Sequence, residues 1–225
     1  MTDYNYKNFK TKFYDLANFP GPKAGEKLID LHLYDINGKQ VMLSGFLDKP
    51  IVLETGSITC PMYAKCIPKM ENLKDKFPNV GFLLIYVREA HPGERTTEHR
   101  TLKQKINLAT KTKKLYGENR VILIDNLNGD FHLQYGGLPD MLYIINTEGT
   151  VVFRGDWNNP AKVSEVLSTL NKNRIITEEH FEPAKPNPFI MLKALSQGGF
   201  IAIWDLIKGI PGLLRLHKKA NEAYK

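Results

Sequence analysis

The sequence predicts an α/β protein in which helices cover a sheet with a parallel centre. Two continuous apolar runs, VGFLLIYVREAH (80–91) and RVILIDN (120–126), have the composition of strands that are buried on both faces, as in parallel sheets. Apolar residues at helical spacing over 62–77, and a basic helical stretch over 96–117, alternate with these strands. A pair of strands over 139–155 and a closing helix complete an α/β sandwich.

The first elements can be justified in chain order. Residues 1–19 form an amphipathic extension, and a hairpin follows at 28–45, where Asn37-Gly38 is a strong turn signal. KPIVLET (49–55) has the pattern of a short buried strand. The helix after it begins near Met62, because Pro61 suits a first helical position.

The remaining order decides the fold type. The strands of 139–155 are antiparallel and joined by a turn at Asn146–Gly149, and 159–172 is the last helix of the domain. The order β-α-β-α-β-β-α is that of a thioredoxin-like fold, and the added hairpin makes it peroxiredoxin-like. We therefore expect an N-terminal extension (1–24), a thioredoxin-like domain (25–172) and a linker with a helical C-terminal extension (173–225).

Composition and charge exclude several classes of function. The net charge is +7, but the lysines are spread along the chain and no nucleic-acid-binding motif is present, so we expect no nucleic-acid partner. The N-terminus has no signal-peptide pattern and no apolar run reaches the length of a membrane span. We therefore expect a cytoplasmic protein. With two cysteines, no CxxC pair and no ligand spacing typical of zinc, we expect no metal.

The C-terminal segment is apolar, interrupted by glycines, and basic at its end. It predicts one or two short amphipathic helices. One interpretation is docking onto the core or onto a second subunit in a homodimer. The other is peripheral contact with a membrane, which Trp204 and the trailing Arg215, Lys218 and Lys219 favour.

Cys60 is the strongest candidate for chemistry. It lies between the 49–55 strand and the following helix, where the free N–H groups and the dipole of a helix N-terminus favour a thiolate nucleophile. Ser57 and Thr59 are candidate hydrogen-bond donors to its sulfur. Cys66 lies more than a helical turn further on, so a bond between the two sulfurs requires local unwinding. A resolving thiol and a core cysteine remain equal readings of Cys66.

Glu89 and His91 end the strand next to the one before Cys60. Carboxyl ends of neighbouring parallel strands open at one edge of a sheet, where ligand sites form. We expect His91 to stabilise the thiolate or transfer a proton there, and Glu89 to orient His91 or bind a polar group of the substrate. The other five histidines lack a comparable setting.

Several motifs together resemble one family. GSITCPMY, VGFLLIYVREAHP, GGLPDMLYIINTEGTVVFRG and DWNNPAKVSEVL resemble, in the same order, segments of the iodothyronine deiodinases. The resemblance covers about residues 40–170 and leaves 1–20 and 173–225 outside it. It implies that Cys60 stands where that family has selenocysteine, that Glu89 and His91 match its Glu-Ala-His motif, and that Pro139 is a cis-proline beside the nucleophile. Met141 stands where the family has an arginine suggested to hold the iodothyronine.

The resemblance implies a thiol-dependent oxidoreductase that removes halogen, such as iodine, from a small aromatic substrate. The Cys60 thiolate attacks the halogen, His91 delivers a proton to carbon, and Cys66 or an external thiol such as thioredoxin or a low-molecular-weight thiol restores Cys60. No metal or organic cofactor is implied. One alternative is a peroxiredoxin-like thiol peroxidase, although Leu53 stands where that pattern has proline. Another is a non-catalytic thioredoxin-fold binding module.

Overall fold

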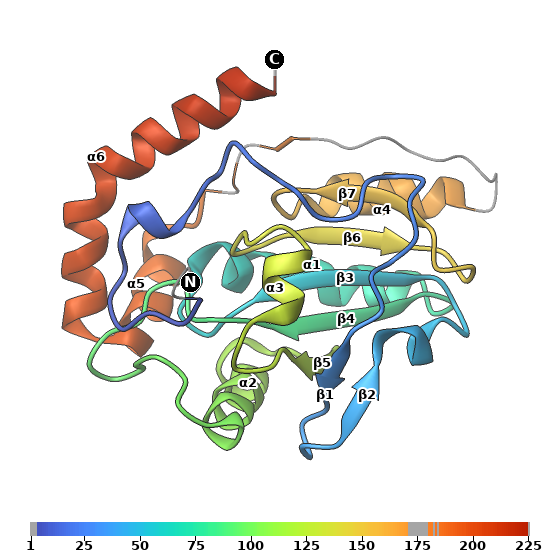
Figure 1. The fold of residues 1–225 in the computed structure, drawn as a ribbon, viewed down its shortest axis with the longest axis horizontal. Coiled ribbons are helices and arrows are strands. Elements are labelled where there is room, and N and C mark those ends of the chain that lie inside the picture. Colours follow the sequence, from blue (N-terminus) through green and yellow to red (C-terminus); the bar gives the residue numbers. More distant parts are fainter. Residues whose placement is uncertain (1–3, 171–179, 182, 184, 225) are drawn as a thin grey trace.

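The computed structural model describes residues 4–170, 180, 181, 183 and 185–224 (Figure 1). Seven strands form one mixed sheet in the order β2-β1-β5-β4-β3-β6-β7. The strands are β1 (His32–Tyr34), β2 (Gln40–Met42), β3 (Ile51–Gly56), β4 (Gly81–Tyr86), β5 (Val121–Ile124), β6 (Leu142–Ile145) and β7 (Val151–Gly155). The α-helices are α1 (Pro61–Lys76), α2 (Leu102–Tyr116), α3 (Asp130–Gln134), α4 (Pro160–Thr169), α5 (Pro188–Gly198) and α6 (Phe200–Ala223), and two 3₁₀ turns are η1 (Thr11–Phe13) and η2 (Leu43–Phe46).

The centre of the sheet is parallel, as the sequence predicts. β3 and β5 both run parallel to β4, and β6 pairs antiparallel with β3. The predicted hairpin is β1–β2, and Gly38 adopts a φ of 82° in its turn. The order β3-α1-β4-α2-β5-α3-β6-β7-α4 therefore gives the predicted α/β architecture.

Alternating residues of each central strand face two different layers. Val52 of β3 and Phe82 of β4 pack against α1 and α4, and Leu84 packs against α1 and α2. Leu53 and Leu83 point the other way, into a cluster with α3 and the N-terminal segment. Figure 1 shows α3 and that segment crossing the near face of the sheet. All six residues of β3 and of β4 are buried, which explains the continuous apolar character of β4 and of the first half of β3.

One strand boundary differs from the sequence prediction. β4 ends at Tyr86, so Glu89 and His91 lie in the loop after it and not on the strand itself. Backbone pairing with the neighbouring parallel strands stops at Gly56 and Ile124, and the chain turns away beyond them. The alternating direction of strand side chains therefore does not apply to Glu89 and His91.

Both ends of the chain pack on the domain. The N-terminal segment buries Tyr6, Phe9 and Leu16 in the main cluster. α5 packs on α1, and α6 lies next to α5 and η1, beside the carboxyl ends of β3 and β4 (Figure 1). These two helices match the predicted C-terminal helices and dock on the core. Outside the described residues lie 171 and 172, at the end of the predicted last helix, and 173–179, 182 and 184 of the expected C-terminal part. No helix in the described part of the chain is long and apolar enough to cross a membrane.

A buried ion network joins β3, α1 and the segment between α2 and β5. The Arg120 guanidinium pairs with Glu54 of β3 and makes a two-point contact with Glu118, at 2.6 Å and 2.8 Å. Tyr63 of α1 donates to Glu118 over 2.9 Å. The side chains of all three ionic residues have no exposed surface, so each carboxylate depends on the guanidinium for compensation.

Replacing Arg120 therefore leaves two buried carboxylates without their cation. We expect Arg120→Met to lower the free energy of unfolding by about 4 kcal/mol, measured by urea denaturation. The control is Arg100→Met, which removes a guanidinium of 72% exposed side-chain surface from its 2.9 Å pair with Glu98. That change should cost about 0.5 kcal/mol or less. Equal effects for the two variants would contradict the assignment.

Candidate active site

Cys60 lies at the start of α1, as predicted. It is the N-cap residue, Pro61 follows at the first helical position, and the Cys60 N–H donates to the Ser57 carbonyl over 3.0 Å. Only 2% of the Cys60 surface is exposed. The turn thus fixes the sulfur at a helix N-terminus, but inside the protein.

The expectation that this position favours a thiolate is wrong for this conformation. Burial raises the pKa of the Cys60 thiol well above its ordinary value, and the Asp140 carboxyl raises it further. The backbone N–H groups of Tyr63 and Met62 lower the pKa, as a helix N-terminus should, but by less. At neutral pH the resting group is therefore a thiol, and a base is needed to ionise it.

Glu89 holds the turn before Cys60 in place. One carboxylate oxygen accepts hydrogen bonds from the N–H of Thr59 at 3.2 Å and from its hydroxyl at 2.6 Å. The other lies 2.5 Å from the Tyr86 hydroxyl and 3.0 Å from Nε2 of His99. Burial raises the pKa of Glu89, but the contacts with His99, Thr59 and Tyr86 outweigh it and the pKa is lowered, so the group is an anion.

This network corrects two predictions. Glu89 does not orient His91 through a hydrogen bond, and its imidazole partner is His99, which the sequence did not single out. The hydroxyls of Ser57 and Thr59 have other partners than the Cys60 sulfur. The Thr59 hydroxyl donates to Glu89, and the Ser57 hydroxyl oxygen accepts from the N–H of Ala90 at 3.1 Å. Both residues instead join the loop after β3 to the loop after β4.

His91 is positioned through its backbone. Its N–H donates to the Thr59 hydroxyl over 3.1 Å, next to Cys60 in the chain. The ring packs on Phe9 with a centroid distance of 4.7 Å, and Nδ1 is buried without a hydrogen-bond partner. Burial lowers the pKa of His91 to about 4. His91 is therefore a neutral imidazole with an available nitrogen.

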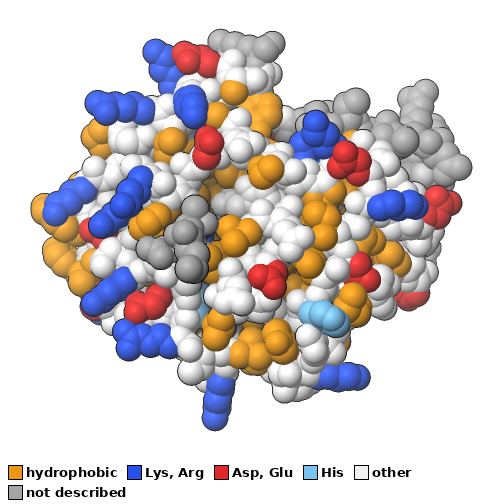
Figure 2. Space-filling model, in the orientation of Figure 1, with side chains coloured by type: hydrophobic (Ala, Val, Ile, Leu, Met, Phe, Trp, Pro, Cys, Tyr) orange, Lys and Arg blue, Asp and Glu red, His pale blue; other side chains and the backbone are white. Residues whose placement is uncertain are grey.

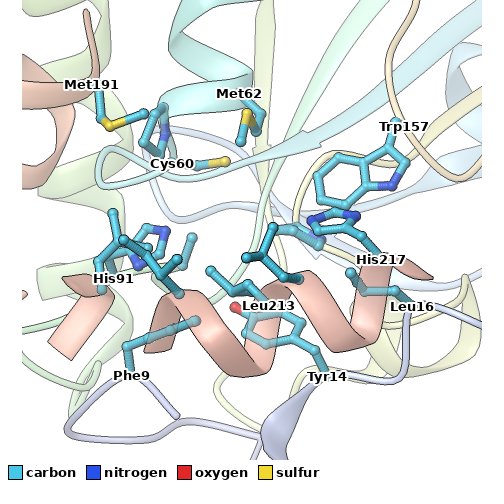
Figure 3. Close-up of a pocket in the computed structure, with 16 residues that line it drawn as sticks. Phe9, Tyr14, Leu16, Cys60, Met62, His91, Trp157, Met191, Leu213 and His217 are labelled. Atoms are coloured by element: carbon cyan, nitrogen blue, oxygen red, sulfur yellow. The ribbon is translucent and has the colours of Figure 1, made fainter. Parts of the chain in front are cut away.

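Cys60 and His91 line the same cavity, of about 290 Å³ (Figure 3). Both chain ends supply much of its wall, and the other lining residues are mostly apolar. They are Phe9, Tyr14, Leu16, Pro61, Met62, Ala90, Pro139, Trp157, Met191, Leu206, Ile210, Leu213, Leu214 and His217. The strand scaffold thus presents the sulfur, and the two termini enclose it.

Two further groups escaped the sequence analysis, and one of them lines the cavity. His217 of α6 lies on the cavity wall, with its ring centroid 5.9 Å from that of Trp157. It therefore lines the same cavity as Cys60, a position that the sequence analysis predicted for His91 alone among the histidines. Arg88 holds the N-terminal segment: it donates to the carbonyls of Tyr4 and Phe13, and its guanidinium lies 4.9 Å from the ring of Tyr6. A lone arginine beside Glu89 gave no sequence signal for this role.

Pro139 lines the same cavity as Cys60, but its peptide bond is trans, as is every peptide bond of the described residues. The expected cis bond is therefore a wrong prediction. Gly136 and Gly137 adopt positive φ angles of 126° and 73° just before it. These residues turn the chain towards β6 with the ordinary, more stable trans isomer.

Cys66 lies away from the cavity wall. Both cysteines are free and buried, and Cys66 packs with Met70 of α1 and Val52 of β3. Its sulfur and carboxylate oxygens of Glu54 and Asp140 all lie within 4.8 Å of one another. Because Arg120 already neutralises Glu54 and all three groups are buried, we assign no metal ion to them. The neighbouring Glu54 adds to burial in raising the pKa of Asp140.

The Thr59 hydroxyl connects Glu89 to His91, so its removal is a direct test of the network. We expect Thr59→Val to lower the free energy of unfolding by about 2 kcal/mol, because a buried carboxylate and a backbone N–H each lose a partner. Thr97→Val is the control, since that hydroxyl makes a single long contact of 3.4 Å with the Glu98 carbonyl. A Thr59 variant as stable as the Thr97 variant would refute the network's role.

Comparison with known proteins gives this geometry a family. The protein-family model described as Iodothyronine deiodinase matches residues 4–174 of this chain. The chain is 28% identical over 167 residues to the Type I iodothyronine deiodinase of Xenopus laevis, covering 67% of this chain and 64% of that protein. It is 30% identical over 136 residues to a Thyroxine 5-deiodinase of Bos taurus, covering 56% and 44%. The chain thus spans less than two thirds of the length of these relatives.

Solved structures support the fold. A putative thiol:disulfide interchange protein DsbE from Chlorobium tepidum and the peroxidoxin BcpB from Mycobacterium tuberculosis each align with a TM-score of 0.52, at 15% and 19% identity. Each alignment covers 68% of this chain, with 98% and 99% of the other. The thioredoxin-like prediction is therefore confirmed.

The family match starts at residue 4, so the expectation that 1–20 lie outside the resemblance is wrong. The physical reason is visible in the cavity, where Phe9, Tyr14 and Leu16 form part of the wall around Cys60. The match extends over most of the chain and includes the turn, the loop after β4 and the closing hairpin. The chain belongs to the iodothyronine deiodinase family.

Proposed function

We propose that this protein is a thiol oxidoreductase that reductively removes halogen from an aromatic substrate, with Cys60 as the nucleophile. One observation supports it most: the Cys60 sulfur and the neutral imidazole of His91 share the wall of one mostly apolar cavity. A neutral imidazole takes a proton from a thiol, and an apolar cavity selects an uncharged ring.

The reaction is balanced with these two groups. His91 accepts the thiol proton, and the Cys60 thiolate attacks the halogen of the carbon–halogen bond. A sulfur–halogen bond forms, the carbon–halogen bond breaks, and its electron pair stays on the ring carbon. The imidazolium then protonates that carbon. The sum is a thiol and an aryl halide giving a sulfenyl halide and an arene, with the carbon reduced and the sulfur oxidised.

A second half-reaction restores the thiol. One molecule of external thiol attacks the sulfenyl halide, so that halide leaves and Cys60 forms a mixed disulfide with that thiol. A second thiol molecule then releases the Cys60 thiol by thiol–disulfide exchange. A low-molecular-weight thiol is the reductant we propose over thioredoxin, because only 2% of the Cys60 surface is exposed and a protein thiol must reach the sulfur. Cys66, which packs in a separate cluster, is not required in this scheme.

The cavity supports a proposal for the substrate class. Its volume of about 290 Å³ and its Phe9, Tyr14 and Trp157 walls suit an iodinated aromatic ring. Relatives are named for iodothyronine and thyroxine. Met141, at the position of the family's suggested arginine, is fully buried and is not among the cavity-lining residues. We therefore propose a halogenated, phenol-like ring as the substrate.

Cysteine variants test the nucleophile. With dithiothreitol and an iodinated phenol, we expect the wild type and Cys66→Ser to release iodide, and Cys60→Ser to release none above background. The two substitutions are matched in chemistry, and both sites are buried. The same samples are tested with hydrogen peroxide. Peroxide consumption that depends on Cys60, without iodide release, would replace this proposal with a peroxidase, and activity in neither assay would favour a binding module.

The pH profile and a variant test His91. Because its pKa is lowered from 6.5 to about 4, His91 is neutral above that range and we expect an iodide-release rate that does not fall between about pH 7 and about pH 5. His91→Asn should lower the rate constant for iodide release by roughly a hundredfold or more. His32→Asn, an exposed histidine of β1, is the control and should change nothing. A rate that halves near pH 6.5 would show that the base is an ordinary, solvated imidazole.

A further inference from the structure

The outer surface of α5 and α6 is unusually apolar. Eleven large hydrophobic side chains are exposed among the described residues, and eight of them lie on these two helices. Phe200, Trp204, Ile207 and Leu214 form a stripe along α6 at spacings of three, four and seven residues, with exposures of 71%, 48%, 51% and 66%. We call this the outer face of α6. A concentration of this kind marks an interaction surface.

α6 is apolar on its inner side as well. Ala202 and Ala220 are buried, Leu213 packs against the main cluster, and Gly209 and Gly212 approach the N-terminal segment so closely that a Cβ would lie 2.8 Å from Phe9 or Thr11. An exposed apolar helix face of this size normally marks a contact surface. The inner side is covered by the domain, so the outer face requires an occupant from outside it.

The charges around the outer face are mostly positive. Lys208, Arg215, Lys218 and Lys219 are exposed on α6, and Glu222 is its one exposed carboxylate among the described residues. Asp205 is partly buried and accepts from Asn8 over 3.3 Å. The Lys208 ammonium lies 5.1 Å from the Trp204 ring. Figure 2 shows hydrophobic and basic side chains side by side along the left edge, where Figure 1 places α6.

We propose that the outer face of α6 seats the protein on an anionic membrane surface, with the helix lying in the interface and not crossing it. Trp and Phe side chains next to Lys and Arg are the residue types that such interfacial helices use. The exposed lysine and arginine side chains of α6 complement the negative charge of acidic lipid headgroups. A two-fold contact with a second copy is disfavoured, because it would place the same basic residues of both copies around one apolar patch.

The position of the face adds a consequence for the cavity. Ile210 and Leu214 are exposed on α6 and also line the Cys60 cavity. A protein seated through this face has the rim of that cavity against the bilayer. An apolar ligand dissolved in the lipid then reaches the cavity without crossing water. Membrane binding depends only on the apolar and charged side chains of α6, so its test is independent of the proposed dehalogenation chemistry.

Vesicle binding by the full chain tests the seating without any activity readout. We expect co-sedimentation with phosphatidylcholine vesicles that contain phosphatidylglycerol, weaker binding at high salt, and little binding to pure phosphatidylcholine. The chain has two tryptophans, and Trp157 is 4% exposed, so a blue shift of tryptophan emission on adding the anionic vesicles reports on Trp204. No binding and no shift would overturn the proposal.

Matched variants separate the two contributions. Trp204→Gln with Ile207→Gln should abolish binding, whereas Leu133→Gln, a 44% exposed leucine of α3, should leave it unchanged. Lys208→Gln with Arg215→Gln should weaken binding roughly thirtyfold, whereas Lys111→Gln with Lys113→Gln removes the same charge from α2 with little effect. Circular dichroism confirms that each variant is folded.

The competing occupant gives a different result. Light scattering of the free protein measures its mass in solution. A dimer that the Trp204 and Ile207 changes dissociate would assign the outer face to a second copy and overturn membrane seating. Equal binding by the α6 and α2 charge variants would also overturn it, because the basic residues around the outer face would then have no specific role.

Discussion

The placement of the reactive groups depends on one buried carboxylate. Glu89 binds the N–H and hydroxyl of Thr59, the hydroxyl of Tyr86 and the imidazole of His99, and so ties together the loops after β3 and β4. Because Thr59 precedes Cys60 and its hydroxyl also accepts from the His91 N–H, both candidate groups share that anchor. A buried charge with several donors has one favourable arrangement, which makes the anchor rigid.

Burial shifts the pKa values of Cys60 and His91 in opposite directions. It raises the pKa of the Cys60 thiol and lowers the pKa of His91, so both are neutral at rest. Proton transfer from the Cys60 thiol to the His91 imidazole therefore creates a thiolate–imidazolium pair inside an apolar cavity, and the two charges then stabilise each other. The helix N-terminus, which sequence reasoning took as the main influence on Cys60, contributes in the expected direction but is outweighed by desolvation.

Sequence reasoning succeeded where local pattern and packing agree. The all-buried β3 and β4, the Asn37-Gly38 turn and the placement of Cys60 before α1 follow from residue types alone. It failed where contacts join residues distant in the chain. The partnership of Glu89 with His99 and the enclosure of the sulfur by α6 leave no periodic signal. The strand prediction over 80–91 overran because the loop after β4 is also buried, with Val87 and Ala90 in the core.

The enclosure of the sulfur by the two chain ends separates chemistry from selection. Cys60 and His91 belong to loops fixed by the sheet, whereas Phe9, Tyr14, Leu213 and other wall residues come from segments outside it. Substitutions in the termini can change which molecules fit without disturbing the carboxylate anchor or the strands. Natural variation in substrate range among proteins built this way should accumulate at the ends of the chain, while the interior of the sheet stays the same.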